Sequence, residues 1–246
     1  YVRLKSYIIK KLKNLSLICS NVIISVSNMA KQELIDNLNL SSKKIYSIYL
    51  GVEEEIEKIN NIKKKYFLYV ANSASHHNHT ILLNSFRNYI KSINKEYHLY
   101  LVMDIIHKEQ YKTLYKLILE LGIEENVKII PPMPKKHLNK YYRDATLYLF
   151  PSLSETFGMT TLEAMACGAP VLCSNISAMP EVNGDAAIYF NPMDTNDIVE
   201  KINLVLEDKI LYNKMIEKGY QRIKKFTWEN TASQTLNLFE NLVRNT

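Results

Sequence analysis

The stretch that decides the fold is YLFPSLSETFGMTTLEAMACGAPVLC, residues 148–173. Its apolar start predicts a buried strand that ends at Phe150, and a proline and a polar loop follow. Gly158 then begins a helical segment that Gly168 ends, and a second apolar strand starts at Pro170. A strand–loop–helix–strand unit of this kind is typical of a parallel sheet, so this stretch predicts an α/β fold.

The same alternation continues on both sides of this stretch. Strands are expected at 66–71, 97–103, 127–130, 146–150, 170–174 and 186–190, and helices at 78–91, 108–122, 135–144, 194–207, 210–225 and 227–243. Short strands separated by helices indicate a Rossmann-like parallel sheet with helices on both faces. Upstream, helices at 1–14 and 29–38 and strands at 21–27 and 44–50 predict a partial N-terminal α/β segment.

The chain is expected to have three parts. A run of glutamates after Gly51 breaks the pattern and places a boundary near that residue. We therefore expect residues 1–51 to be the end of an N-terminal domain with its linker, residues 52–226 to be the Rossmann-like domain, and residues 227–246 to be a closing helix. Residue 1 is Tyr rather than Met, so we expect the chain to be a processed product or a piece of a longer one.

Composition excludes several classes of protein. Of the 246 residues, 47% are hydrophobic and 23% are charged, which is unlike a disordered chain. The net charge of +6 arises mainly in residues 1–13, which carry five basic residues and no acid. These residues form either the solvated face of an ordinary helix or a peripheral contact with an anionic membrane surface. Because only five of the 31 basic residues are Arg, nucleic acid is not an expected partner.

The cysteines bear on localisation. Cys19, Cys167 and Cys173 make an odd number, and no two of them have CxxC spacing. Such usage is typical of a reducing compartment, so we expect a cytoplasmic protein, with the membrane contact of residues 1–13 left open as an alternative. The sequence lacks the GxGxxG and GxxxxGK[ST] motifs, which argues against a dinucleotide cofactor and against a P-loop enzyme.

The chemistry is expected where the helix after residue 157 begins. Unpaired N–H groups and the positive end of the helix dipole meet there, so the amides of Gly158, Met159 and Thr160 can hold a phosphate. Glu155 precedes this point, and Glu163 lies about one turn inside the helix. Two carboxylates beside a phosphate suit the hydroxyl groups of a sugar and a ribose, as in a nucleotide-diphosphate sugar. The alternative is that both glutamates are surface acids beside a plain connecting helix.

Six segments carry a resemblance to a known family. They are FPSLSETFG (150–158), LEAMACGAPV (162–171), MPEVNGDAAIYFNP (179–192), FTWENTA (226–232), VSNMAKQEL (26–34) and KIYSIYLGV (44–52). The first four resemble the C-terminal half of family-4 retaining glycosyltransferases of the GT-B fold, whose E-x7-E signature appears here as Glu155 to Glu163. The last two resemble the end of that family's N-terminal domain and the interdomain link. The resemblance therefore covers nearly the whole chain.

The resemblance implies a role for each matching residue. It places Glu155 in the catalytic position, against hydroxyls of the transferred sugar, and Glu163 against the ribose hydroxyls. The other donor contacts would come from the backbone of Phe157, Gly158, Met159 and Thr160 and, along the base, from Ile130, Pro131 and Pro132. The closing helix would cross back toward the N-terminal domain. No metal or cofactor is implied, since the nucleotide sugar is the substrate.

One position departs from the family pattern. Family members usually carry an Arg and a Lys after the first strand of this domain, but that place reads YVANSASHHN (69–78), with His76 and His77. Imidazole titrates near pH 6.5, so we expect donor affinity to rise from about pH 8 to about pH 6. With His79 the pair forms HHxH, yet a metal site is not expected, because no acid or Cys stands nearby in the sequence. A plain loop is the alternative.

The resemblance implies a retaining glycosyltransferase. Its donor would be a nucleotide-diphosphate sugar, a UDP-hexose or UDP-N-acetylhexosamine, and its acceptor a glycan or a lipid-linked glycan in bacterial surface polysaccharide synthesis. Two alternatives stay open. One is a non-catalytic module that binds nucleotide sugars, and the other is a sugar-nucleotide epimerase of similar fold.

Overall fold

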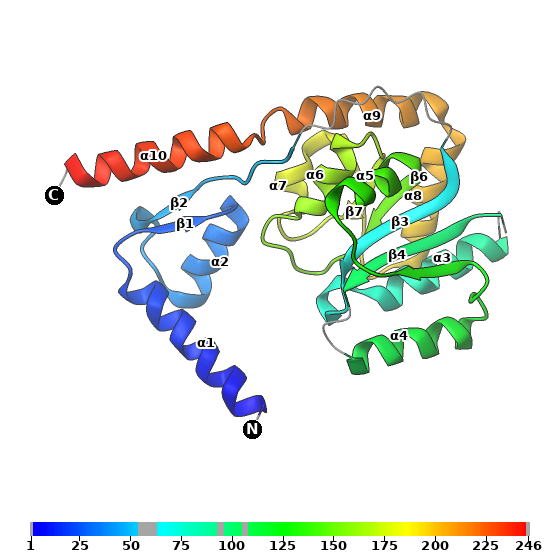
Figure 1. Cartoon of the computed structure of the whole chain (residues 1–246), viewed down its shortest axis with the longest axis horizontal. Coiled ribbons are helices and arrows are strands. Elements are labelled where there is room, and N and C mark those ends of the chain that lie inside the picture. Colours follow the sequence, from blue (N-terminus) through cyan, green and yellow to red (C-terminus); the bar gives the residue numbers. More distant parts are fainter. Residues whose placement is uncertain (1, 54–62, 93–95, 105–107, 245–246) are drawn as a thin grey trace.

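The computed structural model describes residues 2–53, 63–92, 96–104 and 108–244, with side chains from Lys11 onward. Its centre is a six-stranded sheet in the order β5-β4-β3-β6-β7-β8, in which every pairing is parallel (Figure 1). The strands are β3 (Lys64–Asn72), β4 (His98–Asp104), β5 (Val127–Ile130), β6 (Ala145–Phe150), β7 (Val171–Ser174) and β8 (Ala187–Phe190). This arrangement confirms the predicted Rossmann-like parallel sheet.

Helices cover both faces of the sheet. On one face α3 (His79–Ser92) packs against α4 (Lys108–Leu121) and α8 (Thr195–Glu207). On the other, α6 (Met159–Ala166) packs against α5 (Lys135–Asp144) and α9 (Lys209–Ile223) (Figure 1). The short elements are η2 (Ser75–His77), α7 (Met179–Asn183) and η3 (Gly184–Ala186). The layers follow from the apolar spacing: Leu82, Leu83, Phe86, Tyr89 and Ile90 form the buried face of α3.

The core lies on both faces of the central strands. All six residues of β6 are buried, and Phe67, Leu68 and Tyr69 of β3 are fully buried beside it. Strands covered on both sides need continuous apolar runs, which is why these strands could be located from the sequence. Cys167 and Cys173 are buried in this core.

The strand order defines a switch point between β3 and β6. From β3 the chain proceeds outward to β4 and β5, and from β6 it proceeds the opposite way to β7 and β8. The loops that follow β3 (residues 73–78) and β6 (residues 151–158) therefore leave the sheet side by side, at the carboxyl ends of neighbouring strands. Open α/β sheets bind their ligands at such a point.

Residues 2–51 form an N-terminal segment with its own small core. It contains α1 (Val2–Cys19), β1 (Ile23–Ser25), α2 (Asn28–Leu38), η1 (Ser42–Lys44) and β2 (Ile45–Ser47), and β1 pairs with β2 in parallel. Ile23, Leu40 and Ile45 are its buried cluster. Helix α1 is longer than predicted. Strands β1 and β2 are shorter than predicted, because the chain forms loops beyond the paired residues.

The proposed membrane contact at residues 1–13 falls mostly on side chains outside the described set. Beyond them, Leu12, Leu15 and Ile18 of α1 are exposed. Among the described helices, none combines the length and the apolar character that crossing a bilayer requires.

The closing helix α10 (Trp228–Arg244) leaves the sheet domain and runs past the N-terminal segment (Figure 1). Its start is tied to the linker: Val52 N–H donates to the Phe226 carbonyl at 2.8 Å, and Thr231 Oγ1 donates to the Tyr49 carbonyl at 2.7 Å. Gly51 permits this approach, because a Cβ there would lie 2.3 Å from the Trp228 nitrogen. The linker and the closing helix therefore hold the N-terminal segment from one side.

Candidate functional site

The two loops at the switch point are fastened to each other. Leu153 N–H, in the loop after β6, donates to the His76 carbonyl, in the loop after β3, at 2.8 Å. The Ser152 hydroxyl donates to Glu155 Oε1 at 2.8 Å. The topology thus brings together Glu155 and the histidine pair, which the sequence separates by more than seventy residues.

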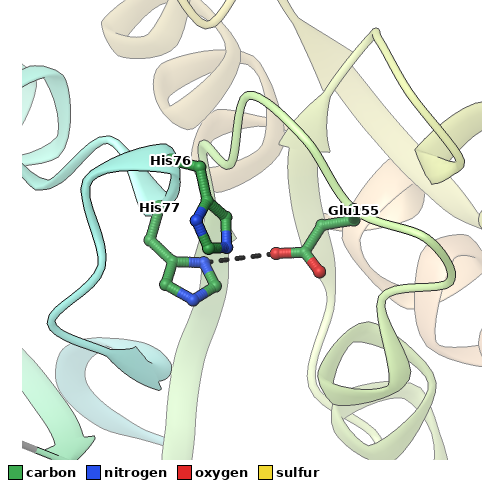
Figure 2. Close-up of side chains that lie close together, drawn as sticks. All are labelled: His76, His77 and Glu155. Carbon is green, nitrogen blue, oxygen red and sulfur yellow. Dashed lines mark ion pairs between the residues drawn. The ribbon is translucent and has the colours of Figure 1, made fainter. Parts of the chain in front are cut away.

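The histidine side of the site consists of His76, His77 and Glu155 (Figure 2). His77 Nδ1 lies 3.2 Å from Glu155 Oε1, and the His77 side chain is 8% exposed. The two imidazole rings lie 4.0 Å apart between centroids. Burial lowers the pKa of His76 below its usual value near 6.5, and His77 lowers it further, while Glu155 acts the opposite way. His76 is therefore a neutral imidazole at neutral pH.

His79 does not join this group. Its Nε2 lies 3.2 Å from the Tyr69 hydroxyl, and burial lowers the pKa of His79 to about 4. The expectation that no acid stands near the histidines is wrong. Glu155 lies beside His76 and His77, because it reaches them from the neighbouring loop. Sequence spacing does not show a contact between two loops.

The start of α6 has no side-chain cap. Gly158 is its N-cap in the left-handed region, with φ +85°, and Thr161 N–H turns back to the Gly158 carbonyl at 3.0 Å. The amides of Met159 and Thr160 precede that bond, where a helix leaves N–H groups without intrahelical partners. Phe157 is 3% exposed and packs on Tyr49 and Phe226, so only its backbone is available for a ligand.

The lysine side of the site is built around Glu163, inside α6. Tyr142 donates its hydroxyl to Glu163 Oε2 at 3.3 Å, and Lys135 Nζ lies 3.8 Å from Oε1. Burial raises the pKa of Glu163, and the lysine and the tyrosine hydroxyl partly offset this. Lys135 also lies 3.0 Å from a carboxylate oxygen of Glu53, so one ammonium is shared by two acids.

The segment expected along the base ends at this lysine side. Ile130 is the buried last residue of β5, and Pro131 and Pro132 are exposed after it. They stand a few residues before Lys135, where α5 begins. The start of α5 thus lies shortly after these three residues in the chain, and its Lys135 lies 3.8 Å from Glu163.

Sequence reasoning missed the residues that position Glu155 and Glu163. Glu155 N–H donates to Ser177 Oγ at 2.9 Å, and the same hydroxyl donates to the Glu155 carbonyl at 2.7 Å. Ser177 has φ +59°, a conformation that a non-glycine residue adopts rarely. Nothing in the sequence marked it. Lys135 and Tyr142 had a readable signal, since residues i and i+7 share one face of the predicted helix.

Glu181 joins the site to the N-terminal segment. Its carboxylate accepts the N–H groups of Asn28 and Met29 at 2.7 and 2.8 Å, which caps the start of α2, and the Tyr49 hydroxyl at 2.9 Å. Ser27 Oγ donates to the Thr156 carbonyl at 2.6 Å, one residue from Glu155. We call these contacts the Glu181 latch.

Several known proteins are similar to this chain in sequence or in fold. The serotype-specific mannosyltransferase WbdA of Escherichia coli is 29% identical over 239 residues, which are 92% of this chain and 29% of WbdA. Sucrose-phosphate synthase from Thermosynechococcus elongatus has a TM-score of 0.82 at 21% identity, over 96% of this chain and 62% of that one. Anabaena HepE, crystallised with UDP and glucose, has a TM-score of 0.79 at 18% identity, over 90% and 63%. The chain therefore spans less than two thirds of each of these proteins.

A family model gives the assignment. The model for glycosyl transferases group 1 matches residues 52–222, which include the whole six-stranded sheet and both glutamates of the site. The α/β architecture with its parallel sheet matches that of the GT-B glycosyltransferases with similar folds. The chain accordingly belongs to the group 1 glycosyl transferase family.

Proposed function

We propose that this chain is the donor-binding part of a retaining glycosyltransferase that uses a nucleotide-diphosphate sugar. The observation that carries the proposal is the uncapped start of α6, with Glu155 in the loop before it at the switch point of the sheet and Glu163 inside the helix. Fold similarity to HepE, which was crystallised with UDP and glucose, supports it.

Each part of the site has a task in this proposal. The amides at the start of α6 bind the diphosphate and stabilise the charge that develops on it as it leaves. Glu155 accepts hydrogen bonds from the transferred sugar, and the buried Glu163 accepts them from the ribose. Imidazole N–H groups of His76 and His77 take the role of the family's cations and contact the diphosphate. Ile130, Pro131 and Pro132 line the base, and retention follows from the family resemblance.

For the substrates we propose chemical classes rather than single compounds. The donor is a UDP-hexose or UDP-N-acetylhexosamine, and the mannosyltransferase name of WbdA makes a mannose donor a further candidate. The acceptor is a glycan or a lipid-linked glycan at the cytoplasmic face of a membrane. Much of an acceptor domain would lie outside this chain, which spans 29% of WbdA.

Calorimetric titration with UDP, GDP and their hexose conjugates tests the proposal. We expect one nucleotide to bind, and Glu163→Gln to weaken it by about tenfold or more, because a hydrogen bond to a charged group contributes about 1.5–3 kcal/mol. Glu217→Gln, on an exposed position of α9, is the matched control and should leave affinity unchanged. Equal binding by the Glu163 variant would overturn the assignment.

Product analysis then separates the alternatives. Incubation with a bound nucleotide sugar should release free nucleotide slowly, and faster with an acceptor glycan. Binding without any turnover would favour a non-catalytic module. An epimerised sugar nucleotide would favour an epimerase.

A further inference from the structure

Figure 2 shows three side chains of metal-ligating type converging from two loops. His76 and His77 come from the loop after β3, and Glu155 comes from the loop after β6. One ligand atom from each lies within 4.8 Å of the other two. His76 is exposed, His77 is buried and Glu155 is half-buried, so the group has one side open to solvent.

The spacing of these atoms suits a small dication. Two ligands about 2.1 Å from a tetrahedral zinc ion lie about 3.4 Å apart. His77 Nδ1 and Glu155 Oε1 are separated by 3.2 Å, so a single ion can contact both without a change of backbone. His76 is the exposed member, and one of its ring nitrogens lies within 4.8 Å of the ligand atoms of the other two.

The buried nitrogen of His77 is the second observation. Among the described residues, His77 Nδ1 makes no hydrogen bond, although it is shielded from solvent. It faces the carboxylate at ion-pair distance without the alignment of a hydrogen bond. A buried polar atom without a partner is costly, and a metal ion bound between it and Glu155 would satisfy it.

The neighbours of the group hold its loops in place. The Ser152 hydroxyl donates to Glu155 Oε1, and Leu153 N–H donates to the His76 carbonyl, so both loops keep their positions relative to each other. Partners of this kind orient the ligands of metal sites. Imidazole nitrogen with one carboxylate oxygen is a donor set of zinc and similar transition metals, whereas magnesium prefers oxygen ligands alone.

We propose that His76, His77 and Glu155 bind a transition-metal dication of the zinc class, with a fourth position left for water. The consequence rests on the proposed function: Glu155 is the acid assigned to the donor sugar, so the metal and the nucleotide sugar exclude each other. The metal is then an inhibitor of donor binding.

Metal binding is measured without any nucleotide. Zn²⁺ is titrated by calorimetry and Co²⁺ by its visible absorption, on the full chain with Cys19→Ser, which removes an exposed thiol that could bind zinc. We expect one ion per chain and a four-coordinate Co²⁺ spectrum. His76→Ala and Glu155→Gln should each weaken binding by at least about tenfold. His98→Ala, at an exposed histidine of β4, is the matched control and should not. Thermal unfolding without metal confirms that the variants fold.

The outcomes distinguish the two proposals. Unchanged Zn²⁺ affinity in both ligand variants, or a Co²⁺ spectrum of the hydrated ion, overturns the metal site whether or not UDP binds. If Zn²⁺ binds as expected, UDP-sugar affinity is measured with and without it, and a decrease of at least about tenfold at saturating metal is expected. Undiminished or tighter binding of the sugar nucleotide overturns the inhibitory role. Failure of every nucleotide to bind the metal-free chain overturns the proposed function instead.

Discussion

The two glutamates of the site share one motif but have opposite surroundings. On the histidine side, Glu155 stands in a loop, against two imidazoles and a serine hydroxyl. On the lysine side, Glu163 stands in a helix, against a tyrosine hydroxyl and an ammonium that it shares with Glu53. The difference teaches that the spacing of a motif sets where its acids stand along the chain, while the strand order decides which side chains meet them.

Replacing Gly158 should disturb both the histidine side and the lysine side of the site, and it should have the largest effect on stability and nucleotide affinity. An added Cβ would lie 2.1 Å from Met179 Cε, and φ is +85°, so Gly158→Ala should lower the free energy of unfolding by about 2–4 kcal/mol. Nucleotide affinity should fall too, because the start of α6 shifts.

Gly122→Ala is the matched control for that change. Gly122 also has a positive φ, +63°, but a Cβ there meets nothing within 4 Å. Urea denaturation should therefore show a loss of only about 1–2 kcal/mol for this variant. Equal losses at both glycines would mean that the contact with Met179 has no importance.

Replacing Glu155 or Glu163 by Gln should distinguish the role of the histidine side from that of the lysine side. We expect Glu155→Gln to change UDP affinity by less than about twofold but to reduce turnover of the sugar nucleotide by about a hundredfold. Glu163→Gln should weaken UDP and UDP-sugar alike. Calorimetry and a donor-hydrolysis assay give both numbers. The interpretation fails if Glu155→Gln weakens UDP as much as Glu163→Gln does.

Lowering the pH should weaken the binding of UDP through Glu163, on the lysine side. Because burial raises the pKa of Glu163, its carboxylate takes up a proton at a higher pH than an ordinary glutamate does. The protonated group accepts hydrogen bonds poorly, so UDP affinity should fall severalfold as pH is lowered from about 7 to about 5. Titrations across this range check the sign. The fall should disappear in Glu163→Gln, and its persistence there would assign it to another group.

Protonation of the histidines should raise UDP affinity as pH falls, which is opposite to the effect of Glu163, and this is the smallest effect that we expect. Since burial lowers the pKa of His76, its charge appears mostly below the range from about pH 8 to about pH 6. We expect UDP affinity to rise by less than about threefold over that range, measured in the Glu163→Gln background, where the opposing trend is absent. A profile without any rise in that background, also below about pH 6, would remove the imidazoles from the diphosphate.

Local signals made most of the fold and part of the site predictable. Short-range signals mark the ends of β6 and α6. The apolar run that stops at Pro151 predicts the end of β6, and two glycines, Gly158 and Gly168, predict the start and the end of α6. The structure places both elements as expected. The acid beside the histidines was not predictable, because Glu155 meets His77 only through the pairing of β3 with β6. Ser177 and Glu181 were missed for the same reason, since each acts on residues far away in the sequence.

The Glu181 latch has a mechanical consequence. A swing of the N-terminal segment about its linker has two routes: it breaks the bonds of Glu181 to Asn28 and Met29, or it pulls on Thr156 through Ser27. Thr156 is the immediate neighbour of Glu155, so the second route moves the acid itself. If the N-terminal segment swings relative to the sheet domain, the latch would couple that motion to the position of the Glu155 carboxylate.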